Sequence, residues 1–334
     1  MQTKKFSAFK KVSLSLLVCA LLAGALFVNH IRRISDFFEL CGEGSLQQII
    51  EAIENGANVN ARGINGITPL FTAVHNPNPE VITALVNAGA DVNARAKKGV
   101  TPLMLAANLS TNPEVITTLV NAGADVNVRA NNGGTPLILA ARRNPNPEVI
   151  SILVQAGADV NVKDNYGWTP LMWAVATNNN PEVIIALVNV GADVNASEAE
   201  LGGTPLMWAA ARNSNPEVIT ALIKAGAEVN VRANNGGTPL ILAARRNPNP
   251  EVISILVKAG ADVNTKSNDG NTPLIVAAYG NPNPEIITLL LDFGADPKAK
   301  DNFGRMAIDF ARENELLINT EVLKRLEEMS LNSA

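Results

Sequence analysis

The sequence predicts an all-α repeat solenoid, and three observations support this fold class. The stretch from Val126 to Val154 recurs without a change from Val229 to Val257. Looser copies fill most of the chain at a period of 33 to 35 residues. Each copy contains a Thr-Pro-Leu triplet, and the triplets begin at Thr68, Thr101, Thr135, Thr169, Thr204, Thr238 and Thr272. Such a period is typical of units that are too small to bury their own apolar face and therefore stack on their neighbours.

The residue pattern of each unit predicts two short helices. In the unit around Thr135, the threonine is a favourable N-cap and Pro136 suits the first helical position, so the first helix begins there. It ends near Arg142 and Arg143. Asn146, followed by Pro and Glu, starts the second helix in the same way. This second start recurs at Asn78, Asn112, Asn146, Asn180, Asn215, Asn249 and Asn283.

An extended finger leads from each second helix to the next unit. Gly157 ends the second helix where a left-handed residue is needed, and residues 158–161 lead out to a turn. A glycine stands two residues before the threonine position in every finger, as a turn with positive φ demands. These glycines are Gly66, Gly99, Gly133, Gly167, Gly202, Gly236, Gly270 and Gly304. The finger between Asn195 and Gly202 carries one extra residue.

Two helices and a β-hairpin finger per unit, with Thr-Pro-Leu and Gly-Ala-Asp-Val-Asn at this period, closely resemble the ankyrin repeat. The resemblance extends from about Ser35 to the C-terminus. It implies that a partner binds the concave face, which finger tips and the exposed ends of first helices form. The family's usual histidine after Thr-Pro-Leu is replaced, so we expect apolar packing instead of its hydrogen bonds. The replacements are Phe71, Met104, Ile138, Met172, Met207, Ile241 and Ile275.

The two ends of the repeat array differ from its middle. Residues 63–298 hold seven full repeats, and residues 34–62 look like an N-terminal cap repeat without Thr-Pro-Leu. Residues 299–334 form a C-terminal cap repeat whose last helix, residues 319–329, offers charged side chains to solvent. We therefore expect one elongated ankyrin repeat domain over residues 34–334.

Residues 1–33 have the pattern of a signal peptide or a signal-anchor helix. Lys4, Lys5, Lys10 and Lys11 precede an uncharged, mostly apolar run over residues 12–28. The run is at the lower limit for spanning a bilayer, and residues 23–25 offer a cleavage signal, so both outcomes stay open and we favour the anchor. The excess of positive charge before the run would place the repeats outside the cytoplasm, on the periplasmic or extracellular side. The alternative is a buried N-terminal helix of the solenoid.

Composition and charge argue against several function classes. The net charge of −4 disfavours a generally basic nucleic-acid binder. Cys19 and Cys41 provide no disulfide framework. His30 and His75 have no setting of a catalytic triad or a metal ligand, and His75 is expected at the surface. We therefore expect a protein that is not an enzyme and that uses no cofactor, no metal and no small-molecule substrate.

Acidic residues that follow Gly-Ala in successive repeats would stack in a row along the solenoid. A row of carboxylates could bind a metal ion, but the fixed place after Gly-Ala, with Asn58 and Glu228 as substitutes, favours a structural role in a turn. The acids are Asp91, Asp125, Asp159, Asp193, Asp262 and Asp296.

Arginines recur at the ends of the first helices and would form an interrupted basic strip. Their planar forks of donors suit carboxylates or phosphates. The alternative is a solvated helix end that pairs locally, for instance with Glu148 and Glu251, and duplication alone could have placed two of the pairs. The arginines are Arg142, Arg143, Arg212, Arg245 and Arg246.

Four aromatic residues cluster in the middle of the chain. Trp173 and Trp208 occupy the helical position of Leu139 and Leu242 and are expected to pack. Tyr166 and Trp168 lie at a finger tip, and an exposed tryptophan there is a candidate binding hot spot, with packing on the neighbouring finger as the alternative.

The favoured hypothesis is a non-enzymatic protein-interaction scaffold, exported or membrane-anchored. It would bind a protein partner through Arg142, Arg143, Tyr166, Trp168, Arg212, Arg245 and Arg246. A second hypothesis is binding of an anionic polymer, nucleic acid or acidic glycan, through the arginine strip. An enzyme with a site not visible in the sequence is the third.

Overall fold

The computed structural model describes residues 36–178 and 180–331, and all their regular structure is helical. The first helices of the repeats are α3 (Pro69–Ala73), α5 (Pro102–Leu109), α7 (Pro136–Arg143), α9 (Pro170–Thr177), α11 (Pro205–Arg212), α13 (Pro239–Arg246) and α15 (Pro273–Gly280). The second helices are α4 (Glu80–Asn87), α6 (Pro113–Asn121), α8 (Pro147–Gln155), α10 (Pro181–Asn189), α12 (Pro216–Lys224), α14 (Pro250–Lys258) and α16 (Glu285–Asp292). The end repeats contribute α2 (Leu46–Glu54), α17 (Ala307–Glu313) and α18 (Glu321–Leu331).

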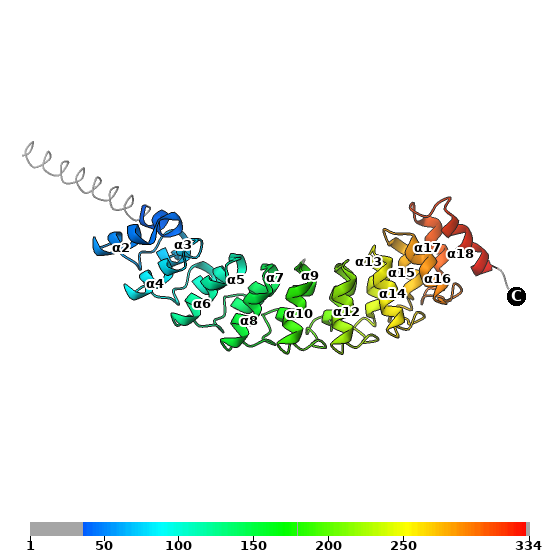
Figure 1. The fold of residues 1–334 in the computed structure, drawn as a ribbon. Helices are drawn as coiled ribbons and strands as arrows, with labels where there is room; N and C mark the ends of the chain where they lie inside the picture. The colour runs from blue at the N-terminus through cyan, green and yellow to red at the C-terminus, as the bar shows by residue number, and fades with distance from the viewer. Residues whose placement is uncertain (1–35, 179, 332–334) are drawn as a thin grey trace, which may run out of the picture. The chain divides into compact units, whose positions relative to one another are not determined.

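The described chain divides into two compact units. One contains the residues up to 106 together with 114–125, and the other contains residues 107–113 together with those from 126 onward. In the second unit, each first helix packs against the next one along the chain, from α7 through α9, α11, α13 and α15 to α17. The second helices, from α8 to α18, form another row beside it (Figure 1). The predicted stacking of helix pairs is therefore present, while the expectation of a single domain over residues 34–334 stays a prediction.

The predicted helix starts are confirmed in most repeats. The hydroxyl of Thr135 accepts a hydrogen bond from the backbone N–H of Ile138 at 3.3 Å, and Pro136 follows in the first helical position. The side chain of Asn146 accepts one from the backbone N–H of Glu148 at 2.9 Å. Two threonines differ, because the buried hydroxyls of Thr68 and Thr204 have no hydrogen-bond partner among the described residues.

Apolar packing does replace the missing histidine of each repeat. The residue after Thr-Pro-Leu lies in the core in every repeat. Its exposed fraction is highest in Phe71 and Ile241, at 4%. These residues are Phe71, Met104, Ile138, Met172, Met207, Ile241 and Ile275. Each is therefore shielded from water, and burial of a large apolar side chain contributes about 1.5–3 kcal/mol.

The fingers are tight turns, and the prediction of β-hairpins is wrong for the described residues, where no strand is present. In a typical finger, the backbone N–H of Ala130 donates to Gly134 and that of Gly133 donates to Ala130, both at 2.9 Å. Pairing is confined to this one residue, which is too short for a β-ladder. The glycine prediction is confirmed, since Gly133 has a φ of 80°.

Buried asparagines tie successive repeats together at the ends of the first helices. The amide nitrogen of Asn281 donates to the backbone carbonyls of Ala244 at 2.7 Å and Asn247 at 3.0 Å, both in the preceding repeat. Its amide oxygen accepts from the backbone N–H of Asn283 at 2.8 Å. One side chain thus satisfies three backbone groups away from water, which favours a fixed distance between repeats. Asn144, Asn178 and Asn247 make corresponding bonds.

The acids after Gly-Ala have the predicted turn role. The carboxylate of Asp159 accepts a hydrogen bond from the backbone N–H of Asn161 at 3.0 Å. The amide oxygen of Asn127, in the preceding repeat, accepts from the backbone N–H of Asp159 at 2.9 Å. The side chain and the backbone of Asp159 are therefore used within the solenoid. No group of three metal-ligating side chains is close enough to hold a metal ion in the part of the chain that is described.

Both end repeats have their expected helix pairs. Residues 36–43 are helical and precede α2, where Ser45 and Gln48 form a capping box. At the other end α18 begins at Glu321, two residues later than expected, because Asn319 has a left-handed backbone with a φ of 62°. The apolar run over residues 12–28 lies outside the described residues, and none of the described helices has the length and apolar character needed to cross a membrane.

Candidate functional site

The three tryptophans of the chain form one cluster, in which Trp168 contacts both of the others. The ring centre of Trp168 is 4.8 Å from that of Trp173 and 4.9 Å from that of Trp208, with tilted ring planes. Trp168 comes from a finger, Trp173 from α9 and Trp208 from α11. All three side chains are only partly buried. This tryptophan cluster joins two successive repeats and offers aromatic surface to solvent.

Sequence reasoning missed two members of the cluster. Trp173 and Trp208 were expected to pack like Leu139 and Leu242, and they do lie at those helical positions. An indole is longer than a leucine side chain, so it reaches beyond the helix row and meets Trp168. The signal in the sequence was the coincidence of two such tryptophans in adjacent repeats with a third in the finger that precedes the first of them.

A buried carboxylate fixes the finger that carries Trp168. Asp164 accepts hydrogen bonds from the backbone N–H of Tyr166 at 2.9 Å and of Trp168 at 3.0 Å. Its second oxygen accepts from the indole Nε1–H of Trp173 at 2.9 Å. Asp164 therefore holds the finger and one ring of the cluster in a single arrangement, as a rigid binding surface requires.

Glycine makes room for the third ring. A Cβ atom placed on Gly203 would lie 2.8 Å from Nε1 of Trp208 and 2.9 Å from its Cε2. Gly203 occupies the position of Trp168 in the next finger, which is the finger with the extra residue. There the longer side chain of Glu198 replaces Asp164 and accepts from the backbone N–H groups of Glu200, Leu201 and Gly203.

Two arginines flank the tryptophan cluster. The guanidinium carbon of Arg142 lies 4.4 Å from the ring centre of Trp173, and that of Arg212 lies 5.2 Å from the ring centre of Trp208. Both distances are within the range of cation–π attraction. Each of these side chains contacts the next, and together they form a continuous surface, called here the Trp–Arg surface. In order, its members are Arg142, Trp173, Trp168, Trp208 and Arg212.

The arginines of the predicted site are not neutralised by nearby acids. None of the five forms an ion pair with a described residue, so the local pairing with Glu148 and Glu251 that was the alternative is absent among the described residues. The described ion pairs involve Arg305, Arg312, Lys324 and Arg325 instead. Positive charge at the predicted site therefore remains available to a ligand.

The structure brings only part of the predicted site together. Arg142, Trp168 and Arg212 belong to the Trp–Arg surface, and Tyr166 is 67% exposed on the finger that carries Trp168. Trp168 is partly exposed and packs against Trp173 and Trp208, so it combines features of the exposed hot spot and of the packing alternative, and its role in binding stays a prediction.

Three predicted arginines lie outside the Trp–Arg surface. Arg143 is exposed and lines a small pocket together with Arg142. Arg245 and Arg246 are exposed at the end of α13, and the position of Trp173 in the repeat that follows them is taken by Val276. His75 is exposed just after α3, as predicted.

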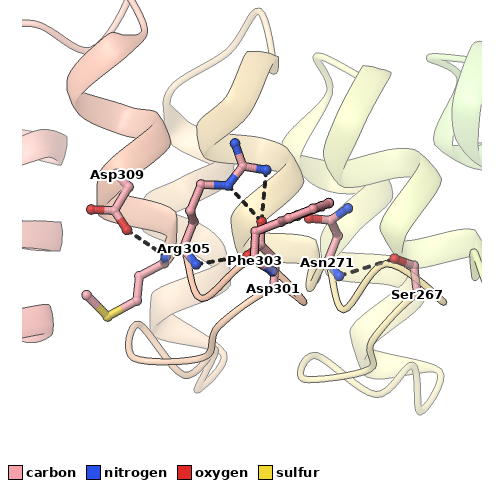
Figure 2. Close-up of polar contacts among 7 residues, drawn as sticks. Ser267, Asn271, Asp301, Phe303, Arg305 and Asp309 are labelled. Atoms are coloured by element: carbon pink, nitrogen blue, oxygen red, sulfur yellow. Dashed lines mark hydrogen bonds and ion pairs between the residues drawn. The ribbon is translucent and has the colours of Figure 1, made fainter.

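A second group of an arginine and aromatic rings lies near the C-terminus, and its arginine differs from those of the Trp–Arg surface because it forms an ion pair. The guanidinium of Arg305 lies 4.3 Å from the ring centre of Phe310, but it also pairs with Asp301 at 3.0 Å (Figure 2). Burial of the Asp301 carboxyl opposes its ionisation. Hydrogen bonds from the backbone N–H groups of Arg305 and Phe303 and from the guanidinium outweigh burial, so the pKa of Asp301 lies below its ordinary value. The cation here is already neutralised, unlike Arg142 and Arg212.

Comparison with known proteins identifies the repeat type. A family model described as "Ankyrin repeats (3 copies)" matches residues 38–130, 106–198 and 206–301, which together make up well over half of the chain. A search of curated proteins gave no match. Ankyrin repeats are generally modules of protein interaction, and their family is typically a non-enzymatic scaffold. On the strength of the family match and the stacked helix pairs, the chain belongs to the ankyrin repeat family.

Proposed function

We propose that this protein is a non-enzymatic scaffold that binds a protein partner on the Trp–Arg surface. The observation that carries the proposal is the unbroken order of two unpaired arginines and three tryptophans across α7, a finger, α9 and α11. Tryptophan and arginine are the residues most enriched in interface hot spots, because they combine a large apolar area with directed polar groups. Tyr166 extends this surface at the finger tip.

The matched arginines of the duplicated block allow a controlled test of this surface. Partner recovery by the wild type would be compared with Trp168→Ala/Arg142→Ala and with Arg245→Ala/Arg246→Ala. The first variant removes the centre of the Trp–Arg surface, and the second removes an equal number of exposed side chains elsewhere. Loss of the partner in the first variant alone supports the proposal. Unchanged recovery in the first variant rejects this site.

Binding of an anionic polymer is the competing function, because the five arginines lack acidic partners among the described residues. Such binding is driven by the release of counterions and weakens steeply as salt concentration rises. A protein partner seated on three tryptophans depends less on salt, since burial of apolar surface drives its binding. Titration with nucleic acid and an acidic glycan over a range of salt concentrations separates the two functions.

We also propose that residues 1–33 direct export or anchor the protein in a membrane, with the repeats on the periplasmic or extracellular side. Support comes from the sequence alone, from the lysines before an uncharged run over residues 12–28. Cell fractionation followed by protease treatment tests the proposal. Repeats that resist added protease in intact cells, and are cleaved once the outer membrane alone is permeabilised, would fit the periplasmic side. Repeats released in the cytosolic fraction would contradict both versions.

A further inference from the structure

A small pocket adjoins the Trp–Arg surface at the ends of α7 and α9. It has a volume of about 500 Å³ and is open to solvent. Its lining residues are Arg142, Arg143, Pro145, Thr177, Asn178, Asn180 and Pro181. None of these is acidic, so the lining that the structure describes carries two positive charges and no negative one.

Most polar groups of this Arg142 pocket, other than the guanidiniums, are already used within the fold. The amide nitrogen of Asn178 donates to the carbonyls of Ala141 and Asn144, and that of Asn180 donates to the carbonyl of Pro145. The hydroxyl of Thr177 lies 3.0 Å from the carbonyl oxygen of Arg142 and 2.8 Å from that of Trp173. The charged N–H groups that remain for a ligand are those of the two guanidiniums, beside one neutral amide N–H of Asn180.

Trp173 orients one of these guanidiniums. Because Arg142 lies over the indole ring at 4.4 Å, the ring holds the guanidinium in place. Stacking uses the π face and leaves the N–H groups at the edge free, and this planar fork matches the two oxygens of a carboxylate. A ligand bound there would continue directly onto the tryptophan cluster.

Backbone N–H groups contribute little to the pocket, and this favours a carboxylate over a phosphate. Pro145 and Pro181 have no N–H, and the N–H of Glu182 is bonded to the side chain of Asn180 at 3.0 Å. Phosphate sites usually add several backbone N–H donors to their basic side chains.

The duplicated block shows that the arginine pair alone does not make this site. Arg245 and Arg246 have the same local sequence as Arg142 and Arg143, but Val276 stands where Trp173 would be. Arg245 therefore has no indole to lie on. The two identical blocks supply both arginine pairs, and the tryptophan of the following repeat distinguishes one of them.

We infer that the Arg142 pocket binds a carboxylate of an acidic segment in the protein partner, next to an apolar residue that lies on the tryptophan cluster. The inference rests on the proposed function and names the chemistry of the partner. Aspartate and glutamate side chains, or a free C-terminal carboxylate, fit the fork of Arg142 and the charge of Arg143.

Polyglutamate is a direct probe of this chemistry. The full-length protein in detergent micelles is titrated against fluorescently labelled polyglutamate of about twenty residues, and binding is followed by anisotropy. The expected result is saturable binding that weakens roughly tenfold or more in Arg142→Gln/Arg143→Gln, since paired arginine–carboxylate contacts are lost. The control Arg245→Gln/Arg246→Gln is expected to change the affinity less than about threefold, because a rim charge contributes little.

Three results would overturn the inference. They are an absence of polyglutamate binding at low salt, an equal loss in both double variants, and tighter binding of inorganic polyphosphate or duplex DNA than of polyglutamate. Circular dichroism verifies that both variants are folded. If polyglutamate does not bind while partner recovery still depends on Trp168, the carboxylate chemistry is wrong and the proposed interaction surface stands.

Discussion

The guanidinium of Arg142 lies over the indole of Trp173, with 4.4 Å between the guanidinium carbon and the ring centre. Arg245 holds the same place in an identical sequence block, and there the following repeat offers Val276. The chain thus contains two arginines with one local sequence and different neighbours. This pair of positions isolates the effect of the tryptophan cluster from that of the helix end.

Replacing Arg142 is expected to change the tryptophan fluorescence, and replacing Arg245 is not. Since the three tryptophans of the chain all lie in the cluster, emission excited at 295 nm reports on this site alone. In Arg142→Ala the free energy of unfolding is expected to fall by about 0.5–1 kcal/mol, the value of a partly exposed cation–π contact. Arg245→Ala is expected to stay within about 0.5 kcal/mol of the wild type. Equal spectra for the two variants would show that Arg142 does not contact the ring.

Gly203→Ala is expected to displace Trp208 from the tryptophan cluster. The new methyl group would lie under 3.0 Å from the indole, and a ring of this size has to rotate away to accept it. Near-ultraviolet circular dichroism measures the coupling of the rings and should decrease. The control Gly134→Ala changes the same position of an earlier finger, where the nearest atom is Oδ1 of Asn132 at 3.2 Å. An unchanged spectrum for Gly203→Ala would contradict the described packing.

Asn281→Ala is expected to destabilise the repeats far more than a change at an exposed asparagine. It removes two hydrogen bonds to carbonyls of the preceding repeat and one from the backbone N–H of Asn283. Leaving such buried groups without partners costs about 2–3 kcal/mol or more. Asn302→Ala, which removes an exposed bond to the carbonyl of Asn268, is the control and should cost less than about 1 kcal/mol. Similar urea midpoints for both variants would disprove a special role of the buried asparagines.

The last finger is expected to lose stability in acid through Asp301. The pKa of this carboxyl is lowered from its ordinary value of 3.8 in the folded state, so ionised Asp301 stabilises the fold. The contribution is fully present above the ordinary pKa and is lost as pH falls through the lower folded pKa. Thermal unfolding of the wild type and Asp301→Asn should therefore differ at neutral pH and converge in strong acid. A difference that does not depend on pH would exclude the linkage.

Cys41 is expected to resist alkylation in the folded protein. Its side chain is fully buried, and burial raises the pKa of the thiol to about 12. At pH 8 the reactive thiolate is therefore scarce and inaccessible. A Cys19→Ser variant reports on Cys41 alone, and its rate of reaction with iodoacetamide should rise sharply in denaturant. Rapid labelling without denaturant would show that the first helix pair opens.

Local sequence determined most of the fold, because each repeat position has its own stereochemical requirement. Thr135 and Asn146 cap helices, Pro136 begins one, and Gly133 turns a finger, as expected. The buried asparagines were not predicted, since Asn144 looks like any polar loop residue until the preceding repeat supplies the carbonyls of Ala107 and Ser110. Hydrogen bonds between repeats depend on how the repeats stack, and the sequence of a single repeat does not reveal which groups the stacking brings together.

The candidate site was predicted in part for the same reason. Arg142, Trp168 and Arg212 were chosen from their exposed repeat positions, and the structure places all three on one surface. Trp173 and Trp208 were set aside because their positions usually hold leucine. Which arginine lies on a ring depends on a side chain from the neighbouring repeat, and this kept Arg142 and Arg245 equivalent in the sequence.

Photo-crosslinking tests the central claim, binding on the Trp–Arg surface, most directly. Benzoylphenylalanine is placed at Tyr166, which is 67% exposed beside the tryptophan cluster, and in a control at Asn189, which is exposed at the end of α10. The account predicts that one partner protein crosslinks at residue 166, that Trp168→Ala/Arg142→Ala abolishes this product, and that residue 189 gives none. The same product from residue 189 alone, or a product at residue 166 that survives the double substitution, would contradict it.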